Sequence, residues 1–174
     1  MNYKTMIFTA LSMVMFSGCI QPKIPDNYKA IAPQSKIYKT YDKFKDTTFY
    51  RHEYSLKNYN IPEVYVVKDQ DKIGYRFVAR YAGEDWIFFT KIYFVNDEGD
   101  RLLFTVKSYN KKTDISYGVK ESIDILLSEQ QRKQLIKVLS SSDVTMRLEG
   151  KYYKEYKIIN TKQPMLEMLR YEGK

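Results

Sequence analysis

Few residues in this sequence have the type and spacing that chemistry requires. The chain has 174 residues, with a single cysteine, Cys19, and a single histidine, His52. His52 precedes Glu53 as in the zinc motif H-E-x-x-H, but Leu56 occupies the position of the second histidine. Neighbouring side chains of a strand point to opposite faces, so His52 and Glu53 should diverge. We therefore predict no metal site, and an ordinary surface or edge position for His52.

Carboxylate catalysis and phosphate binding have equally little support. The closely spaced acids Glu84-Asp85 and Asp97-Glu98 fall in predicted turns, where turn chemistry accounts for them. The sequence has no G-x-S-x-G elbow, and none of its seven glycines precedes a Lys-Ser or Lys-Thr pair. We therefore predict that the protein is not an enzyme and has neither catalytic residues nor a cofactor.

Cys19 stands at the end of an N-terminal apolar segment. One positive charge, Lys4, precedes an apolar run over residues 6–16. The run is too short for a bilayer core of about 30 Å but suits a signal peptide, so we expect residues 1–18 to be removed. A lone cysteine forms no disulfide within one chain, which favours a modified or reactive thiol. The alternative is a chance cysteine beside an ordinary signal or a transmembrane anchor.

The sequence Phe16-Ser17-Gly18-Cys19 resembles the lipobox of bacterial lipoproteins, although Phe16 replaces the usual leucine. The resemblance implies cleavage before Cys19 and a diacylglycerol on its thiol, with palmitate among the expected acyl chains. Two or three acyl chains hold a protein on a membrane essentially permanently, at about 0.8 kcal/mol per buried CH₂. We therefore expect a lipid anchor on the cell membrane. Ile20-Gln21, in place of an aspartate after the cysteine, favours the outer membrane in a diderm host.

The rest of the chain has the length of one domain with a tether. Residues 19–36 contain Pro22, Pro25 and Pro33 and should form a flexible tether, which leaves 37–174 as a single domain. Removal of the signal peptide lowers the formal charge only from +8 to +7. A basic surface attracts anionic polymers or headgroups, whereas the alternative is a merely solvated lysine face. Nucleic acid is excluded by the expected compartment.

Hydrophobic periodicity predicts an α+β domain rich in antiparallel strands. The apolar run 86–95 should form a long strand buried on both faces. The capping box Ser128-Glu-Gln-Gln131 starts a helix that extends to about Leu139, and a second helix begins near Thr161. We expect about seven strands in a sheet or sandwich, with both short helices in the C-terminal third. The strands should fall at residues 48–55, 64–68, 72–81, 86–95, 102–109, 119–125 and 144–158, the last being a hairpin.

A second resemblance covers roughly residues 60–172. It is to a domain of uncharacterised bacterial exported proteins, and it implies a compact β-rich fold and no established activity. Given this resemblance, we expect Glu121 and Arg147 to form a structural ion pair; the alternatives for Arg147 are a pair with Glu149 or Glu155, or a place in a basic patch. The residues that carry the resemblance are Asp85-Trp86-Ile-Phe, Gly99, Val119-x-Glu121-x-Ile123, Leu127-Ser128-Glu129 and Val144-x-x-Arg147-Leu148-x-Gly150.

Aromatic residues are abundant, with 17 Tyr, nine Phe and one Trp. They indicate either a β-rich core or an aromatic recognition face. The candidate binding residues are Trp86, Arg147, Tyr152 and Tyr156, with core packing as the alternative for Trp86. We expect a non-catalytic envelope lipoprotein that binds an envelope protein or an anionic component. The alternatives are a structural or accessory subunit of an envelope complex, or an inhibitor of a host or competitor hydrolase.

Overall fold

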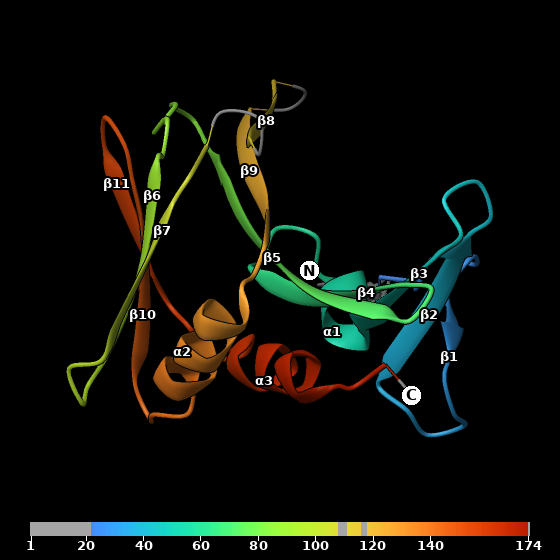
Figure 1. Cartoon of the computed structure of the whole chain (residues 1–174). Helices are drawn as coiled ribbons and strands as arrows, with labels where there is room; N and C mark the ends of the chain where they lie inside the picture. Colours follow the sequence, from blue (N-terminus) through green and yellow to red (C-terminus); the bar gives the residue numbers. More distant parts are fainter. Residues whose placement is uncertain (1–21, 108–110, 116–117, 174) are drawn as a thin grey trace, which may run out of the picture.

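The computed structural model describes residues 22–107, 111–115 and 118–173, and it is α+β with two antiparallel sheets. Figure 1 shows the two sheets side by side, with helices between them at one end. The signal segment and Cys19 lie outside the described residues. In sheet order, the seven-stranded sheet contains β1 (Lys29–Ala30), β2 (Ile37–Asp42), β3 (Thr47–His52), β4 (Glu63–Asp69), β5 (Lys72–Gly83), β9 (Val119–Leu126) and β8 (Lys111–Asp114). The four-stranded sheet contains β11 (Tyr153–Lys157), β10 (Val144–Glu149), β6 (Lys91–Asn96) and β7 (Arg101–Thr105).

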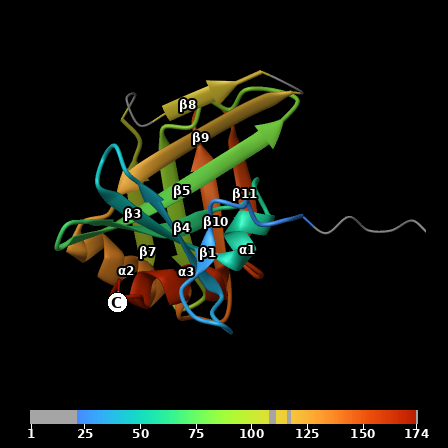
Figure 2. The ribbon, with the colours of Figure 1, turned by 90° about the vertical axis from the view of Figure 1, so that its right-hand side faces the viewer.

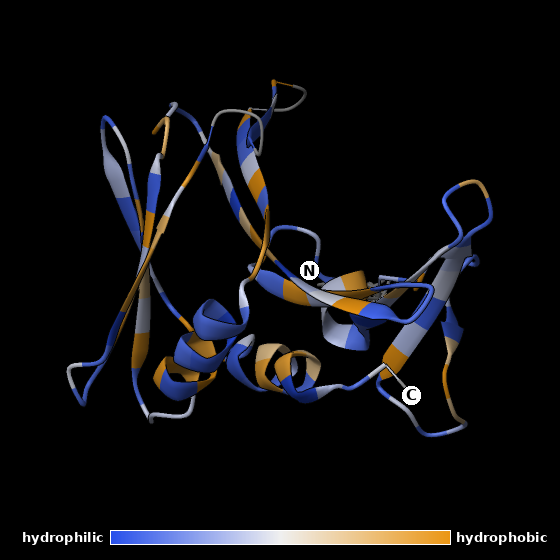
Figure 3. Cartoon of the chain, in the orientation of Figure 1, coloured by the Kyte–Doolittle hydropathy of each residue, from blue (hydrophilic) through white to orange (hydrophobic). Residues whose placement is uncertain are grey.

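The main core lies where the two sheets face each other. In Figure 2, β5 and β9 run diagonally across the strands of the other sheet. The ring of Phe77 on β5 lies 5.5 Å from that of Phe94 on β6 and 5.4 Å from that of Phe104 on β7. All three side chains are buried, and hydrophobic and polar residues alternate along the strands (Figure 3). This alternation places the apolar face of each sheet against the other, as in other two-layer folds.

Two helices close the end of the core that lies away from β8. α2 (Glu129–Leu139) contacts β6 and β7, and α3 (Lys162–Arg170) contacts β3 and β4. The buried residues of α3 include Met165, Met168 and Leu169, whose spacing forms one helical face. A third, one-turn helix, α1 (Glu53–Lys57), follows β3 directly. In the described part of the chain, no helix is both long and apolar enough to cross a membrane.

The capping box of α2 forms as the sequence predicts. The Ser128 hydroxyl accepts a hydrogen bond from Gln131 N–H at 3.2 Å, and the Gln131 side chain accepts from Ser128 N–H at 2.9 Å. We expect Ser128→Ala to lower the free energy of unfolding by about 1 kcal/mol, since one backbone donor loses its acceptor. Urea denaturation should detect this, with Ser122→Ala on β9 as a control outside a helix cap. Equal effects of the two substitutions would contradict a specific role of the cap.

The structure corrects several expectations about the secondary structure. The described residues form eleven strands, not about seven, and three helices, not two. The predicted strand 48–55 ends at His52 because the His52 side chain caps α1, and a strand also forms inside the expected tether, where β1 pairs with β2. The predicted strand 86–95 is wrong in its first half: β6 starts only at Lys91. The backbone N–H groups of residues 87–89 instead donate hydrogen bonds to the buried carboxylate of Glu121.

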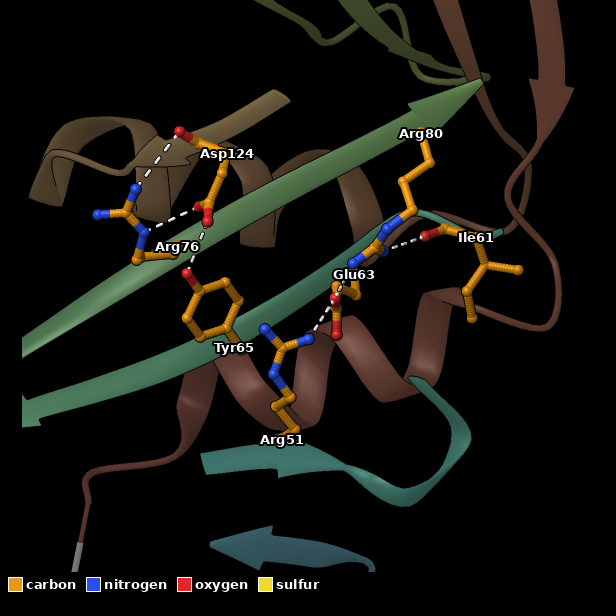
Figure 4. A network of polar contacts seen from close by, with 7 residues as sticks. All are labelled: Arg51, Ile61, Glu63, Tyr65, Arg76, Arg80 and Asp124. Carbon is orange, nitrogen blue, oxygen red and sulfur yellow. Dashed lines mark hydrogen bonds and ion pairs between the residues drawn. The ribbon is translucent and has the colours of Figure 1, made fainter. Parts of the chain in front are cut away.

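The outer face of the seven-stranded sheet, away from the core, carries a buried ion cluster (Figure 4). Glu63 is 1% exposed, and its Oε1 atom lies 2.7 Å from Arg51 Nη1 and 2.5 Å from Arg80 Nη2. A second cluster lies beside it, where Asp124 accepts hydrogen bonds from the Tyr65 hydroxyl at 2.7 Å and from Arg76 Nε at 2.8 Å. Burial, followed by the hydrogen bond to Asp124, raises the pKa of Tyr65. These charges tie β3, β4, β5 and β9 together across the sheet.

Candidate functional site

Exposed aromatic side chains gather at the end of the molecule that lies away from α2 and α3. Here the β5–β6 connection lies beside the β10–β11 turn (Figure 1). Two backbone hydrogen bonds join them, from Lys151 N–H to the Ile87 carbonyl at 3.0 Å and from Thr90 N–H to the Glu149 carbonyl at 2.8 Å. We use the name aromatic end for the surface formed by Trp86, Phe88 and Tyr152 with Lys151.

The three aromatic residues are displayed on the surface and are not packed into the core. Phe88 and Tyr152 are 49% and 56% exposed, and Trp86 is half-buried. The rings of Trp86 and Phe88 stack with their centroids 5.5 Å apart, and Lys151 Nζ lies 5.4 Å from the centroid of Tyr152. Exposed aromatic rings and nearby cations are enriched at binding interfaces. The arrangement can therefore bind an apolar or π-rich surface.

A buried carboxylate holds this segment in place. Glu121 on β9 is fully buried, and its Oε1 accepts hydrogen bonds from Ile87 N–H and Phe88 N–H, both at 2.8 Å. Its Oε2 accepts from Phe89 N–H at 3.2 Å and lies 2.7 Å from Lys111 Nζ. Three consecutive backbone donors thus point at one carboxylate instead of at a neighbouring strand. This explains why residues 86–90 leave the strand conformation that their apolar sequence predicts.

Lys111 connects the carboxylate to the aromatic end. Its Nζ lies 5.4 Å from the ring centroid of Phe88 and 5.5 Å from that of Phe89, so it balances the charge of Glu121 and also contacts both rings. A buried charge is tolerated only when it is paired and hydrogen-bonded, and Glu121 meets both conditions. The aromatic end therefore has a polar support directly beneath it.

The backbone of the aromatic end is also constrained by close contact and by an unusual torsion angle. A Cβ atom on Gly150 would lie 2.3 Å from the carbonyl oxygens of both Ile87 and Phe88, so only glycine allows this approach. Phe88 has a φ of 52°, in the left-handed region that L-residues other than Asn and Asp seldom adopt. Such strain clusters at functional sites, where the surrounding structure enforces it.

The torsion angle of Phe88 leads to a prediction with an unusual sign. Phe88→Gly should be more stable than Phe88→Ala by about 1 kcal/mol, because alanine pays the left-handed penalty and glycine does not. Thermal or urea unfolding of the two variants would measure this difference. At Phe44, which is exposed without a positive φ, the same pair should show alanine equal to or better than glycine. Alanine proving better at position 88 would contradict the left-handed conformation.

Of the four candidate binding residues, Trp86 and Tyr152 lie on the two hydrogen-bonded segments that form the aromatic end. Tyr156 does not join them: it is half-buried and packs against the core, and burial raises its pKa to about 12. Arg147 lies on the solvent-facing side of the four-stranded sheet, beside a shallow depression of about 750 Å³ that Tyr93 and Leu103 also line. The predicted set therefore divides between three places on the protein.

The expected ion pair between Glu121 and Arg147 is wrong. Arg147 instead lies opposite Glu155 in the register of β10 and β11, with Nε 2.8 Å from Glu155 Oε1, and its Nη1 lies 3.9 Å from Glu149 Oε2. Both alternative partners are thus confirmed. The two residues point to different surfaces, because Arg147 faces solvent while Glu121 faces the interior between the sheets. The partner of Glu121 is Lys111.

His52 is buried, contrary to the expected surface or edge position. Its side chain is 6% exposed, and its Nδ1 accepts a hydrogen bond from Tyr54 N–H at 3.0 Å. The hydrogen of the neutral ring is therefore on Nε2, which lies 3.2 Å from Glu167 Oε2 on α3. Burial lowers the pKa of His52, opposed by the nearby Glu167. The residue joins β3, α1 and α3, which is a structural role.

The structure shows no metal cluster among the described residues, and it places at the site two residues that the sequence did not predict. Within residues 22–107, 111–115 and 118–173, no three His, Cys, Asp or Glu side chains are grouped to hold a metal ion. Sequence reasoning missed Phe88, which it assigned to a buried strand, and Lys111, which falls between the expected strands 102–109 and 119–125. The sequence pointed to part of the site, because Glu121 and Gly150 are among the residues that carry the second resemblance. What these two residues do becomes clear only in the folded structure.

The sequence matches no protein-family model, no curated protein and no solved structure. The lipobox of Cys19 and the resemblance over residues 60–172 therefore stay predictions. What the protein does must be inferred from the residues of this chain.

Proposed function

We propose that the protein is a lipid-anchored, non-catalytic binding protein of the bacterial cell envelope, and that its aromatic end contacts the partner. The observation that carries the binding role is the display of Trp86 and Phe88 on a segment held by the buried carboxylate of Glu121, with the exposed Tyr152 on the adjoining β10–β11 turn. Folding alone gives no reason to use a buried charge and a strained residue to expose aromatic rings. A binding role gives that reason, because a rigid aromatic surface loses little conformational entropy when a partner binds.

The chemistry of the aromatic end favours a protein partner. Tryptophan and tyrosine are among the residues that contribute most to the binding energy of protein interfaces, where the surrounding contacts exclude water from them. The cation of Lys151 lies 5.4 Å from the centroid of the Tyr152 ring, and it adds attraction toward an acidic rim on the partner. The stacked pair Trp86–Phe88 provides the flat centre of such an interface.

The anchor restricts where this partner lies. Only Ile20 and Gln21 lie between Cys19 and Pro22, the first described residue, so three residue steps of at most about 3.6 Å each join them. A lipidated Cys19 would therefore hold Pro22 within roughly 11 Å of the acyl-glycerol group. From Pro22 the chain continues along the seven-stranded sheet, where β1 pairs with β2. The partner is then a component close to the membrane surface.

Co-purification from envelope extracts tests the binding role. The anchored full-length protein and its double variant Trp86→Ala/Tyr152→Ala would be expressed in the native host, solubilised and isolated through an affinity tag. We expect the double variant to recover at least roughly tenfold less of the partner, because aromatic anchors typically contribute 2 kcal/mol or more each. The matched control Tyr41→Ala/Phe44→Ala removes two exposed aromatic rings, one near the end of β2 and one in the β2–β3 turn. Equal losses in both variants would contradict a specific role of the aromatic end.

The anchor has its own test. The membrane-extracted protein should have the intact mass of a chain that starts at Cys19 and carries acyl chains, and Cys19→Ala should leave the protein in the soluble or unprocessed fraction. Mass spectrometry and cell fractionation measure these two outcomes. An unlipidated mature chain, or a Cys19→Ala variant that is still processed and membrane-bound, would contradict lipid anchoring.

A further inference from the structure

A pocket on the outer face of the seven-stranded sheet is distinct from the aromatic end. It has a volume of about 400 Å³, and its floor is formed by β5, β8 and β9, with the loop residues Tyr59 and Asn60 as one wall. The main side chains of this pocket are Tyr59, Asn60, Arg80, Lys112, Lys120 and Ser122. Glu121 belongs to β9 as well, but its carboxylate faces the opposite side of the sheet.

Strand register places the polar residues of the pocket on one face. Lys112 on β8 lies opposite Ser122 on β9, which in turn lies opposite Arg80 on β5. Lys120 is two residues before Ser122, and side chains separated by two residues share a face. Lys120 also lies opposite Asp114 on β8. Two lysines, a hydroxyl and a carboxylate thus face the same space.

Arg80 contacts one face of the Tyr59 ring, which forms the aromatic wall of the pocket. The guanidinium carbon of Arg80 lies 5.1 Å from the ring centroid of Tyr59. Arg80 is itself held by Glu63 at 2.5 Å and by the Ile61 carbonyl at 2.9 Å, so it belongs to the buried cluster in Figure 4. These contacts hold the guanidinium of Arg80 in place beside the ring, and the charge of Glu63 is shared between Arg80 and Arg51. Tyr59 is 75% exposed, which leaves its other face open to a ligand.

The two lysines provide the unpaired charge. Neither Lys112 nor Lys120 forms an ion pair with another residue in the described part of the chain. Lysine is a compact cation that binds carboxylate or phosphate as a point charge. Ser122 and Asn60 add groups that exchange hydrogen bonds with hydroxyls. An inorganic anion would leave the ring and these groups unused, whereas a sugar that carries an anionic group would use all of them.

We propose that this pocket binds an acidic sugar unit, with its carboxylate or phosphate between Lys112 and Lys120 and its ring against Tyr59. The ligand class is an anionic saccharide of the size that the pocket volume admits. This inference goes beyond the aromatic end and its partner, because no residue of the aromatic end lines the pocket.

Titration by ¹H–¹⁵N NMR tests the inference on the full-length chain in detergent micelles. The probes are glucuronate, glucose 6-phosphate, glucose and inorganic phosphate. We expect saturable shifts of Asn60, Lys112 and Ser122 with glucuronate, with glucose 6-phosphate or with both, and weaker binding of glucose and of phosphate. The relative affinities of the two acidic sugars then identify the preferred anionic group. No saturable shifts with either acidic sugar, or binding no tighter than that of inorganic phosphate, would overturn the proposal.

Matched variants distinguish the pocket from the general basic charge. Lys112→Ala/Lys120→Ala should weaken binding of the preferred sugar by roughly tenfold or more, since two charge-assisted contacts are lost. Lys133→Ala/Lys154→Ala removes the same charge from exposed positions outside the pocket and should leave the affinity unchanged within about twofold. Equal weakening by both pairs would overturn a specific site. Loss of sugar binding would leave the co-purification result for the aromatic end unaffected, so the two proposals fail separately.

Discussion

Replacing Glu63 by alanine is expected to lower the free energy of unfolding by about 3–5 kcal/mol, among the largest effects of any single substitution in this protein. Glu63 is almost fully buried between Arg51 and Arg80, and its removal leaves two largely buried guanidinium groups without their counter-charge. The loss should be large because an uncompensated buried charge cannot recover its hydration. Urea denaturation followed by circular dichroism would measure it.

An exposed ion pair provides the control for Glu63. Glu155→Ala removes the partner of Arg147 on the solvent-facing side of the four-stranded sheet, where both side chains are more than 40% exposed. Solvent screens this pair, so its loss should be no more than about 1 kcal/mol. Similar effects of Glu63→Ala and Glu155→Ala would contradict a stabilising role of the buried cluster in Figure 4.

Replacing Glu121 by alanine is expected to have an effect of similar size, about 3–5 kcal/mol, and to change the aromatic end as well. The substitution removes the acceptor of three backbone N–H groups, at Ile87, Phe88 and Phe89, and the partner of Lys111. Residues 86–90 should then lose their fixed conformation. The measurements are urea denaturation and the fluorescence of Trp86, the only tryptophan of the chain, which should shift to longer wavelength.

Two further variants serve as controls: Glu121→Gln is the conservative substitution, and Glu84→Ala removes an exposed carboxylate. Glutamine keeps a hydrogen-bond acceptor but loses the charge that balances Lys111, so its effect should lie between those of wild type and alanine. Glu84 is exposed in the same connection and should contribute little. An alanine variant at position 121 that keeps both wild-type stability and wild-type Trp86 emission would contradict the role assigned to the carboxylate.

Sequence patterns such as a capping box or hydrophobic alternation predict the helices and strands that are determined by residues close in sequence. The capping box predicts the start of the helix from Glu129 to Leu139, and the helix ends where the sequence predicts. The strand from Lys72 to Gly83 and the hairpin of β10 and β11 follow from alternation and from Gly150. The α+β class and the antiparallel pairing follow from the same patterns.

The aromatic end depends on contacts that local patterns do not contain. The apolar stretch from Trp86 to Thr90 reads as a strand, yet its N–H groups bind a carboxylate 32–34 residues later in the chain. Glu121 itself looks like one member of an alternating strand, and nothing around it in the sequence marks Lys111 as its partner. Likewise, the ion cluster joins Arg51, Glu63 and Arg80 from three strands. Only tertiary structure brings such groups together, so they were beyond prediction from the sequence.

The most direct test of the central claim is site-specific photo-cross-linking in the intact envelope. A photo-reactive phenylalanine would replace Phe88 or Tyr152 in the anchored protein, and Phe44 or Ile159 at two control positions that are 89% and 72% exposed. We predict one discrete cross-linked partner from positions 88 and 152, absent from both control positions and lost when Trp86→Ala is added. No discrete product from positions 88 and 152, or the same product from all four positions, would contradict the proposal that this protein binds its partner through the aromatic end.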